Sequence, residues 1–265
     1  IPPLPFNGIR LILASAALLL WLLISGENLK IKKEHLGKII FFAITGHTIY
    51  QFIFIYGIYM TTVSNTAVLF STVPVMVSLF SSFLKYEKIK LPGWVGIITA
   101  FIGVYIVISG KGSGFSLSPA NLKGDALILL AVVLWSFYGA ASTPLLKVYS
   151  PLKFVTLTMG IGSLLFFPFS IKAIGELPFA SISAAAWIFL AGSGVLALSL
   201  ALIIWFYSVK KVGSSQTAVY SYLPPLFAVI FAYFILAEAI HQLLVIGGAI
   251  IFLGIFFTRL GRGTV

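Results

Sequence analysis

Cysteine is absent from the sequence, and this absence excludes disulfides, thiol chemistry and metal sites built from thiolates. Charged residues are scarce too: they make up 9% of the 265 residues, whereas soluble domains carry about 25%. Hydrophobic residues make up 60%, and a water-soluble fold of this length cannot bury so much apolar surface. The composition therefore predicts that the lipid bilayer is the solvent for most of the chain.

Acidic residues are few, with 6 Asp and Glu against 17 Lys and Arg, which gives a net charge of +11. A basic balance of this size can indicate a nucleic-acid partner. Here the Lys and Arg residues stand in short clusters between apolar runs, which is typical of cytoplasmic loops that flank membrane helices. We therefore expect no nucleic-acid partner.

Sequence signatures of enzymes are also missing: there is no Walker loop, HExxH, GxSxG or cluster of carboxylates. An intramembrane enzyme would need a base with an acidic or metal partner at depth. His47 is the only histidine in the middle of an apolar run, and the sequence shows no such partner for it. We expect neither catalysis nor a cofactor or metal site.

Nine apolar runs are long enough to cross a membrane, which takes about 20 residues. The connections between them are short and leave no room for a soluble domain. The predicted spans cover residues 6–25, 36–59, 63–84, 92–110, 124–145, 152–171, 184–208, 215–236 and 241–258.

The positions of the basic residues orient these spans. If the connection from Glu27 to Lys38 is cytoplasmic and the sides then alternate, 13 of the 17 basic residues fall in cytoplasmic segments. The outer side then holds Lys111, Lys123 and Lys172, with Arg10 near the outer end of the first span. The positive-inside rule thus predicts that residue 1 is outside and that the C-terminus is cytoplasmic.

The chain contains an internal repeat, the first feature to seek in such a sequence. Residues 64–110 recur without a gap 151 residues later as residues 215–261. Related halves in a membrane protein are typical of transporters. The residues that coincide include the pairs Pro74 and Pro225, Glu87 and Glu238, Gly96 and Gly247, and Gly103 and Gly254.

The halves also align near their starts, since PPLPF at residues 2–6 resembles SPLKF at 150–154. A complete apolar span, 124–145, precedes this motif in the second half but not in the first. We therefore expect one further helix before residue 1 and an inverted second copy, because each repeat then has five helices. The predicted fold is an all-α membrane protein with nine visible transmembrane helices of a ten-helix bundle, built from two inverted five-helix repeats. The predicted domains are a first repeat at 1–110, an outer linker at 111–123 and a second repeat at 124–261.

These features resemble the EamA-like family of the drug/metabolite transporter (DMT) superfamily. The resemblance rests on the openings SNTAV and SQTAV, the Pro within the span, the Glu in the tight turn and the Gly-rich final span of each half. Gly124 and Asp125, followed by the run WSFY at 135–138, resemble the opening of the family's second repeat. Arg10 matches a basic residue that is usual early in the family's second helix. The turn departs from the family pattern, which often has Gly before Glu, at Tyr86 and Ala237.

The resemblance implies an inner-membrane protein that exports amino acids, other metabolites or drugs. We expect a secondary transporter of small organic solutes in the cell (inner) membrane, working by alternating access. The sequence places no Asp or Glu at mid-depth, which favours a zwitterionic, neutral or aromatic solute over a cationic one. A non-transporting membrane scaffold or sensor, a facilitative channel and a homodimer all stay open.

A transporter of this kind needs a polar cavity near the midplane, and polar side chains in apolar spans usually face the interior. His47, Thr48 and Gln51 share one helix face, with Tyr50 at its edge. His47 is either a titrating substrate contact or a neutral residue bonded to a neighbouring helix. The cavity candidates are His47, Tyr50, Gln51, Asn65, Thr72, Trp135, Tyr138, Gln216 and Tyr220.

Trp135 lies too deep for an interfacial belt, so it forms either a flat wall for substrate or a packing contact. Kinks are expected at Pro74, Pro224 and Pro225, because proline removes a backbone donor. Such a kink either exposes backbone to substrate or is a static bend.

Glu87 and Glu238 lie in tight turns, where each carboxylate is expected to accept hydrogen bonds from the free N–H groups of the next helix start. The paired glycines are expected to allow close helix packing, within the bundle or between protomers.

Overall fold

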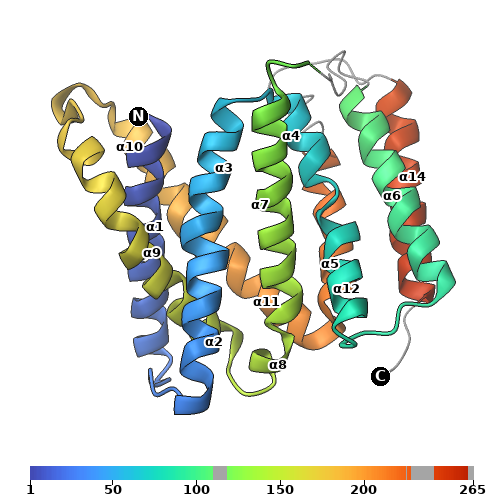
Figure 1. The fold of residues 1–265 in the computed structure, drawn as a ribbon, viewed down its shortest axis with the longest axis horizontal. Coiled ribbons are helices and arrows are strands. Elements are labelled where there is room, and N and C mark those ends of the chain that lie inside the picture. The colour runs from blue at the N-terminus through green and yellow to red at the C-terminus, as the bar shows by residue number, and fades with distance from the viewer. Residues whose placement is uncertain (110–117, 225, 228–241, 262–265) are drawn as a thin grey trace. The chain divides into compact units, whose positions relative to one another are not determined.

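The computed structural model describes residues 1–109, 118–224, 226–227 and 242–261, and every regular element in them is a helix (Figure 1). The elements are α1 (Pro3–Ile24), α2 (Lys33–Ala43), η1 (Ile44–Ile49), α3 (Tyr50–Tyr59), α4 (Val63–Phe70), α5 (Val73–Phe83), α6 (Leu91–Ser109), α7 (Leu122–Ala141), α8 (Thr143–Leu146), α9 (Pro151–Gly175), η2 (Phe179–Ser181), α10 (Ala184–Gly192), η3 (Ser193–Leu200), α11 (Ala201–Val212), α12 (Ser214–Val219), η4 (Tyr220–Tyr222) and α14 (Gln242–Leu260).

Eight helices or runs of consecutive helices among the described residues are long and apolar enough to cross a membrane. They cover Pro3–Ile24, Lys33–Tyr59, Val63–Phe83, Leu91–Ser109, Leu122–Leu146, Pro151–Gly175, Ala184–Val212 and Gln242–Leu260. Each corresponds to one predicted span, so the all-helical membrane fold is confirmed. The remaining predicted span, 215–236, lies partly outside the described residues, and the count of nine stays a prediction.

Helix is the backbone form that satisfies the N–H and C=O groups of a span without help from water. At the start of a helix, where the first N–H groups have no partner in the helix, side-chain oxygens accept their hydrogen bonds. The Thr62 hydroxyl accepts a hydrogen bond from the Asn65 N–H at 3.0 Å at the start of α4. The Ser150 hydroxyl accepts one from the Lys153 N–H at 3.0 Å at the start of α9. Both are N-caps, which define where these spans begin.

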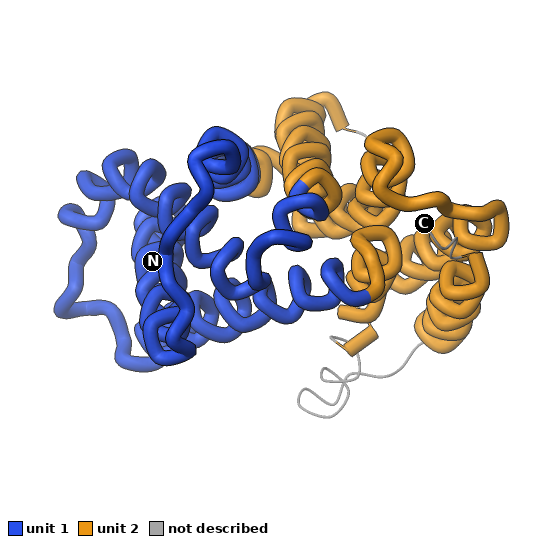
Figure 2. The backbone as a smooth tube through the Cα atoms, turned by 90° about the horizontal axis from the view of Figure 1, so that it is seen from below, with its two compact units in different colours: residues 1–55, 142–211 blue, residues 56–141, 212–265 orange. Residues whose placement is uncertain are grey.

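The described chain forms two compact units, coloured separately in Figure 2. Unit 1 contains residues 1–55 and 142–211, and unit 2 contains residues 56–141 and 212–265. Each unit therefore takes helices from both predicted halves of the sequence. The assignment of two inverted repeats stays a prediction.

In unit 1, α1 packs along α9. The hydroxyl oxygens of Ser15 and Ser163 lie 2.7 Å apart between these helices. Leu11, Ile55 and Phe166 form a buried apolar cluster that joins α1, α3 and α9. The helix pair and α3 therefore share one core.

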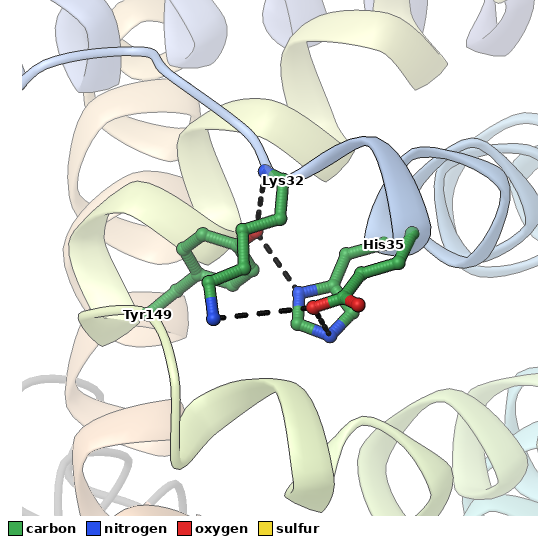
Figure 3. Close-up of polar contacts among 4 residues, drawn as sticks. Lys32, His35 and Tyr149 are labelled. Atoms are coloured by element: carbon green, nitrogen blue, oxygen red, sulfur yellow. Dashed lines mark hydrogen bonds and ion pairs between the residues drawn. The ribbon is translucent and has the colours of Figure 1, made fainter.

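At one end of unit 1, Tyr149 ties the loop after α8 to the start of α2 (Figure 3). Its hydroxyl accepts a hydrogen bond from the Lys32 N–H at 3.1 Å and lies 3.1 Å from Nδ1 of His35. The Glu34 carboxylate lies 3.6 Å from Nε2 of the same histidine. Lys210 Nζ, at the end of α11, donates to the Tyr149 carbonyl at 3.1 Å. Three connections that the charge pattern predicts to be cytoplasmic thus meet at one end of the unit.

In unit 2, α6 and α14 approach each other through glycines. A Cβ at Gly254 would lie 2.4 Å from the Ala100 nitrogen, and one at Gly96 would lie 2.3 Å from the Thr258 nitrogen. Neither position has room for a methyl group, so the two backbones are in direct contact. The sequence left open whether these glycines pack within the bundle or between protomers, and the structure shows them packed within it.

Two spans of the described chain are interrupted by π-helical segments. The π-helix η1 joins α2 to α3, and η3 joins α10 to α11. A π-helix inserts an extra residue into a turn and frequently marks a functional position. In η3, the Ser199 hydroxyl donates to the Ala14 carbonyl of α1 at 3.0 Å, so this interruption is held against its neighbour.

A third interruption separates α4 from α5. Pro74 lies in the first turn of α5 and has no N–H to donate to the preceding turn. Two hydroxyls donate to carbonyls there: Ser71 to Val68 at 2.5 Å and Thr72 to Leu69 at 2.6 Å. The same two carbonyls also accept the backbone N–H groups of Ser71 and Thr72, at 3.1 and 3.0 Å, so tight turns with added hydroxyl bonds replace the regular helix at this break.

We expect Gly162→Ala to destabilise the fold, because a Cβ there would lie 2.5 Å from His47 Cβ and 2.7 Å from the Ala43 carbonyl oxygen. Overpacking of this kind costs about 1–3 kcal/mol. Gly160→Ala in the same helix is the control, since nothing lies within 4 Å of its Cβ. Thermal unfolding of the purified protein in detergent should show a lower midpoint for Gly162→Ala alone. Equal midpoints would contradict the close approach of α9 to η1.

Candidate functional site

Three of the predicted cavity residues belong to unit 1, at η1 and the start of α3. His47 lies inside η1 and is 2% exposed, with Gly162 of α9 against its Cβ. The neighbouring Thr48 hydroxyl donates to the Gly162 carbonyl at 2.9 Å. The sequence treated this segment as a regular α-helix. The π-helical turn instead holds His47 and Thr48 directly against α9.

Gln51 is a buried glutamine, 5% exposed, and the structure shows no hydrogen bond of its side chain among the described residues. Its amide atoms are not fully enclosed, so a polar ligand group can bind them. Tyr50, beside it in the chain, stacks on Phe54 with ring centroids 5.7 Å apart. Gln51 is therefore the predicted residue of unit 1 whose polar group is left available.

Asn65 belongs to unit 2 and is fully buried at the start of α4. Its Nδ2 donates to both carboxylate oxygens of Asp125 at 3.0 Å each. The Thr61 hydroxyl donates to Oδ1 of the same carboxylate at 2.5 Å. Asn65 was predicted as a cavity residue, and its amide is engaged in holding the start of α4 to the start of α7.

Asp125 is a residue that sequence reasoning did not identify as a site. It is 7% exposed, lies in the first turn of α7, and forms no ion pair with a Lys or Arg of the described chain. Its charge is stabilised by neutral donors and by the positive end of the helix dipole. The signal in the sequence was the pair Gly124-Asp125. A Cβ at Gly124 would lie 2.4 Å from the Met60 carbonyl carbon, so glycine is what lets α7 start there.

The aromatic pair of α7 lies away from this carboxylate. Tyr138 is fully buried, and Trp135 is half-buried with its ring centroid 5.7 Å from that of Tyr138. Full burial gives Tyr138 a packing role, whereas Trp135 keeps an accessible surface. Thr72 is also half-buried, and its hydroxyl is used by the helix interruption before Pro74.

Gln216 and Tyr220 line a pocket of about 310 Å³ together with Val212 and Arg259. The Tyr220 hydroxyl accepts hydrogen bonds from Nε of Arg259 at 2.9 Å and from its Nη2. The guanidinium also lies 5.6 Å from the centre of the tyrosine ring. The structure thus brings together two of the predicted cavity residues, and adds an arginine that the sequence did not predict.

Glu87 caps a helix that is distant in the sequence. Its Oε1 accepts hydrogen bonds from the Ser214 N–H at 2.5 Å, the Ser214 hydroxyl at 2.8 Å and the Ser215 N–H at 3.3 Å. The sequence predicted that this carboxylate binds the next helix start, which is α6, and the structure shows it at the start of α12. Gly213, the residue before α12, has φ +93° and brings its backbone against the carboxylate.

Two of the predicted residues fall outside the described part of the chain. These are Pro225 and Glu238. Pro224 is described and exposed, and it follows the 3₁₀ turn η4.

We expect Glu87→Gln to destabilise α12, because an amide offers one acceptor where the carboxylate accepts four hydrogen bonds. The loss should be about 1–3 kcal/mol. Hydrogen exchange of the amides of Ser214–Val219 should speed up, and the thermal midpoint should fall. Glu176→Gln is the control, because Glu176 is an exposed glutamate at the end of α9. If the two variants behave alike, Glu87 is not what holds α12.

The chain is similar to proteins of a known family. It matches the profile of the EamA-like transporter family over residues 1–109 and 122–260. It is 28% identical over 258 residues to the uncharacterized transporter YoaV of Bacillus subtilis (strain 168), covering 97% of this chain and 87% of that protein. An uncharacterized transporter of Archaeoglobus fulgidus is 28% identical over 259 residues, covering 96% of this chain and 87% of that protein.

The fold also resembles a solved crystal structure. The TM-score is 0.84 at 20% sequence identity, with 99% of this chain and 88% of that chain covered. At this identity the likeness shows the fold alone. It agrees with the all-helical architecture of the described residues.

Proposed function

This chain belongs to the EamA-like transporter family, and we propose that it is a secondary transporter that exports small organic metabolites, such as amino acids, by alternating access. Its relatives are named as transporters, which supports transport over a scaffold, a sensor or an enzyme. The printed names give no substrate. The choice of substrate class depends on the polar side chains of the spans.

The observation that carries the proposal is the coincidence of helix interruptions with buried polar side chains. His47 lies in η1, Ser199 lies in η3, and Ser71 lies between α4 and α5, and all three are buried. Interrupted helices in transporters form substrate sites, because irregular backbone in a membrane is tolerated where it lines a cavity or is buried in protein.

We propose further that the chain has two inverted repeats in the cell (inner) membrane, with residue 1 outside and the C-terminus in the cytoplasm. The 151-residue offset and the two segments matched by the family profile support the repeats. The gathering of Lys32, Lys153 and Lys210 around Tyr149 supports a cytoplasmic position for that end of unit 1.

The absence of cysteine makes this orientation directly testable. We expect Ser181→Cys to react with a membrane-impermeant maleimide in intact cells, since Ser181 is exposed in the connection after α9. Lys30→Cys, exposed in the connection after α1, should react only after the cells are permeabilised. The unsubstituted protein is the blank. The reverse pattern of labelling would show that the chain has the opposite orientation in the membrane.

Transport should depend on Gln51. In proteoliposomes, each of the twenty L-amino acids is tested for exchange of labelled solute against unlabelled solute trapped inside. Gln51→Ala should lower the rate about three- to tenfold, because one hydrogen bond to the solute contributes about 0.5–1.5 kcal/mol. Trp135→Ala should also lower it.

Gln242→Ala is the matched control, since Gln242 is an exposed glutamine at the start of α14. All variants are compared at equal amounts of folded protein. Exchange no faster than in empty liposomes for every amino acid would remove amino acids as substrates. Unchanged exchange in Gln51→Ala would remove that residue from the site.

A further inference from the structure

Arg10 is the cationic side chain that lies farthest from a helix end in the described spans. It follows Pro3, the first residue of α1, by seven residues, or about 10 Å along the axis. By comparison, Lys38 follows Lys33, the first residue of α2, by five residues and is exposed. A charge at this depth is costly in lipid and usually indicates a functional position.

The guanidinium of Arg10 has donors that the described chain does not satisfy. Its Nε is buried and has no hydrogen-bond partner. Its Nη1 donates to Oδ1 of Asn7 at 3.5 Å, which is at the limit for a hydrogen bond. No carboxylate of the described residues forms an ion pair with it. An arginine carries five N–H donors, so most of its capacity is unused.

The surroundings of Arg10 are polar and belong to unit 1. Asn7 is 8% exposed, and its Nδ2 donates to the Pro3 carbonyl at 3.2 Å, which leaves Oδ1 for the guanidinium. The Tyr50 phenol is close enough to interact electrostatically with Arg10. The Arg10 carbonyl oxygen would lie 3.0 Å from a Cβ at Gly194, so the π-helix η3 packs directly against this turn.

An anion is the ligand that such a group lacks. A planar guanidinium binds the two oxygens of a carboxylate through two parallel N–H donors, and Nε with one Nη forms such a pair. The free-energy cost of leaving a buried charged donor unpaired exceeds the net gain from a typical hydrogen bond, so binding of an anion to Nε is favoured. We propose that Arg10 binds the carboxylate of the transported solute, which restricts the substrates to compounds with that group. This inference depends on the proposed transport function.

Gln51 provides a second polar contact for the same solute. It shares a helix face with Ile55, four residues later, and Ile55 packs against Leu11, the neighbour of Arg10 in α1. The free amide therefore lies on the side of α3 that faces α1. A carboxylate at Arg10 and an ammonium or hydroxyl group at Gln51 match an amino acid.

An anionic lipid headgroup is the other source of such oxygens. Two features favour the solute: Nε is buried rather than turned to the surface, and Asn7 and Ala14, which lie on the buried side of α1 about one turn from Arg10, are buried as well. Leu13, on the adjacent side, is 36% exposed. The lipid-facing side of α1 carries exposed apolar residues such as Leu20 and Leu23. The experiment includes an arm for lipid.

The test compares free amino acids with their amides, which lack the carboxylate. The purified full chain is heated in detergent with each of the twenty L-amino acids and with the corresponding amino acid amides, and apparent affinities are taken from the shift of the thermal midpoint. At least one free acid should bind tenfold or more tightly than its amide. Arg10→Gln should remove this preference, and Arg10→Lys, which keeps the charge but not the paired donors, should reduce it. Lys172→Gln, an exposed cation at the end of α9, should leave it unchanged.

Each outcome decides the assignment. Equal binding of acids and amides, or a preference that persists in Arg10→Gln, overturns it. If Arg10→Gln does not fold, Arg10→Lys decides alone, and an undiminished preference in that variant overturns the assignment. If phosphatidylglycerol, compared with phosphatidylcholine, stabilises the unsubstituted protein in an Arg10-dependent way and no amino acid does, the ligand is lipid and the carboxylate assignment fails.

Failure of the transport function gives a different result. If free acids bind in an Arg10-dependent way but are not exchanged in proteoliposomes, the anion site is supported and the proposed transport function is wrong. Exchange that Arg10→Gln leaves unchanged keeps transport and overturns the anion site.

Discussion

In a membrane, a span must satisfy its own backbone hydrogen bonds, because hydrocarbon offers no donor or acceptor. The spans that are unbroken obey this by being helical throughout. At the interrupted spans, side-chain hydroxyls add to the backbone bonds: Ser71 and Thr72 donate to carbonyls beside the break before Pro74, and Ser199 donates to the Ala14 carbonyl of α1. Hydroxyl groups also donate to carbonyls within unbroken helices, as Thr158 does to Phe154 at 3.0 Å. Ser and Thr therefore bond to the backbone throughout this apolar chain, and the breaks are one place where they do so.

The same requirement explains the two carboxylates of unit 2. The short helices α4 and α12 each begin beside a carboxylate from another part of the unit. Asp125 binds Asn65 and Thr61 near the start of α4, and Glu87 binds Ser214 and Ser215 at the start of α12. A helix of six to eight residues gains little stability from its own hydrogen bonds. Both helices are consequently stabilised by a carboxylate from another part of the unit.

The sequence was sufficient for the all-helical membrane class, for eight of the nine predicted spans and for the family. Hydropathy alone located the span 63–84 within one residue of the observed Val63–Phe83, because the length of an apolar run is set by the thickness of the bilayer. The π-helices were not predicted, since an extra residue in a turn leaves the apolar pattern almost unchanged. The partner of Glu87 was not predicted either, because the carboxylate and Ser214 lie 127 residues apart in the sequence.

The sequence identified which polar residues of the spans are buried, but not which hydrogen bonds they make. Polar residues in apolar spans were correctly recognised as buried at His47, Gln51 and Asn65. Which of them remains available depends on tertiary partners: Asn65 is used by Asp125, whereas the Gln51 amide has no partner in the described chain. Periodicity places a side chain on a face of its helix. It does not say whether a neighbouring helix already occupies the hydrogen bonds of that side chain.

The glycine contacts between α6 and α14 have a mechanical consequence. A Cβ at Gly103 would lie 2.8 Å from the Gly247 carbonyl oxygen, and one at Gly254 would lie 2.4 Å from the Ala100 nitrogen. Sliding one helix along the other would drive backbone into backbone at several levels at once. We therefore expect α6 and α14 to move together as one rigid pair. Bending of unit 2 would then occur at the breaks between its short helices, α4, α5 and α12.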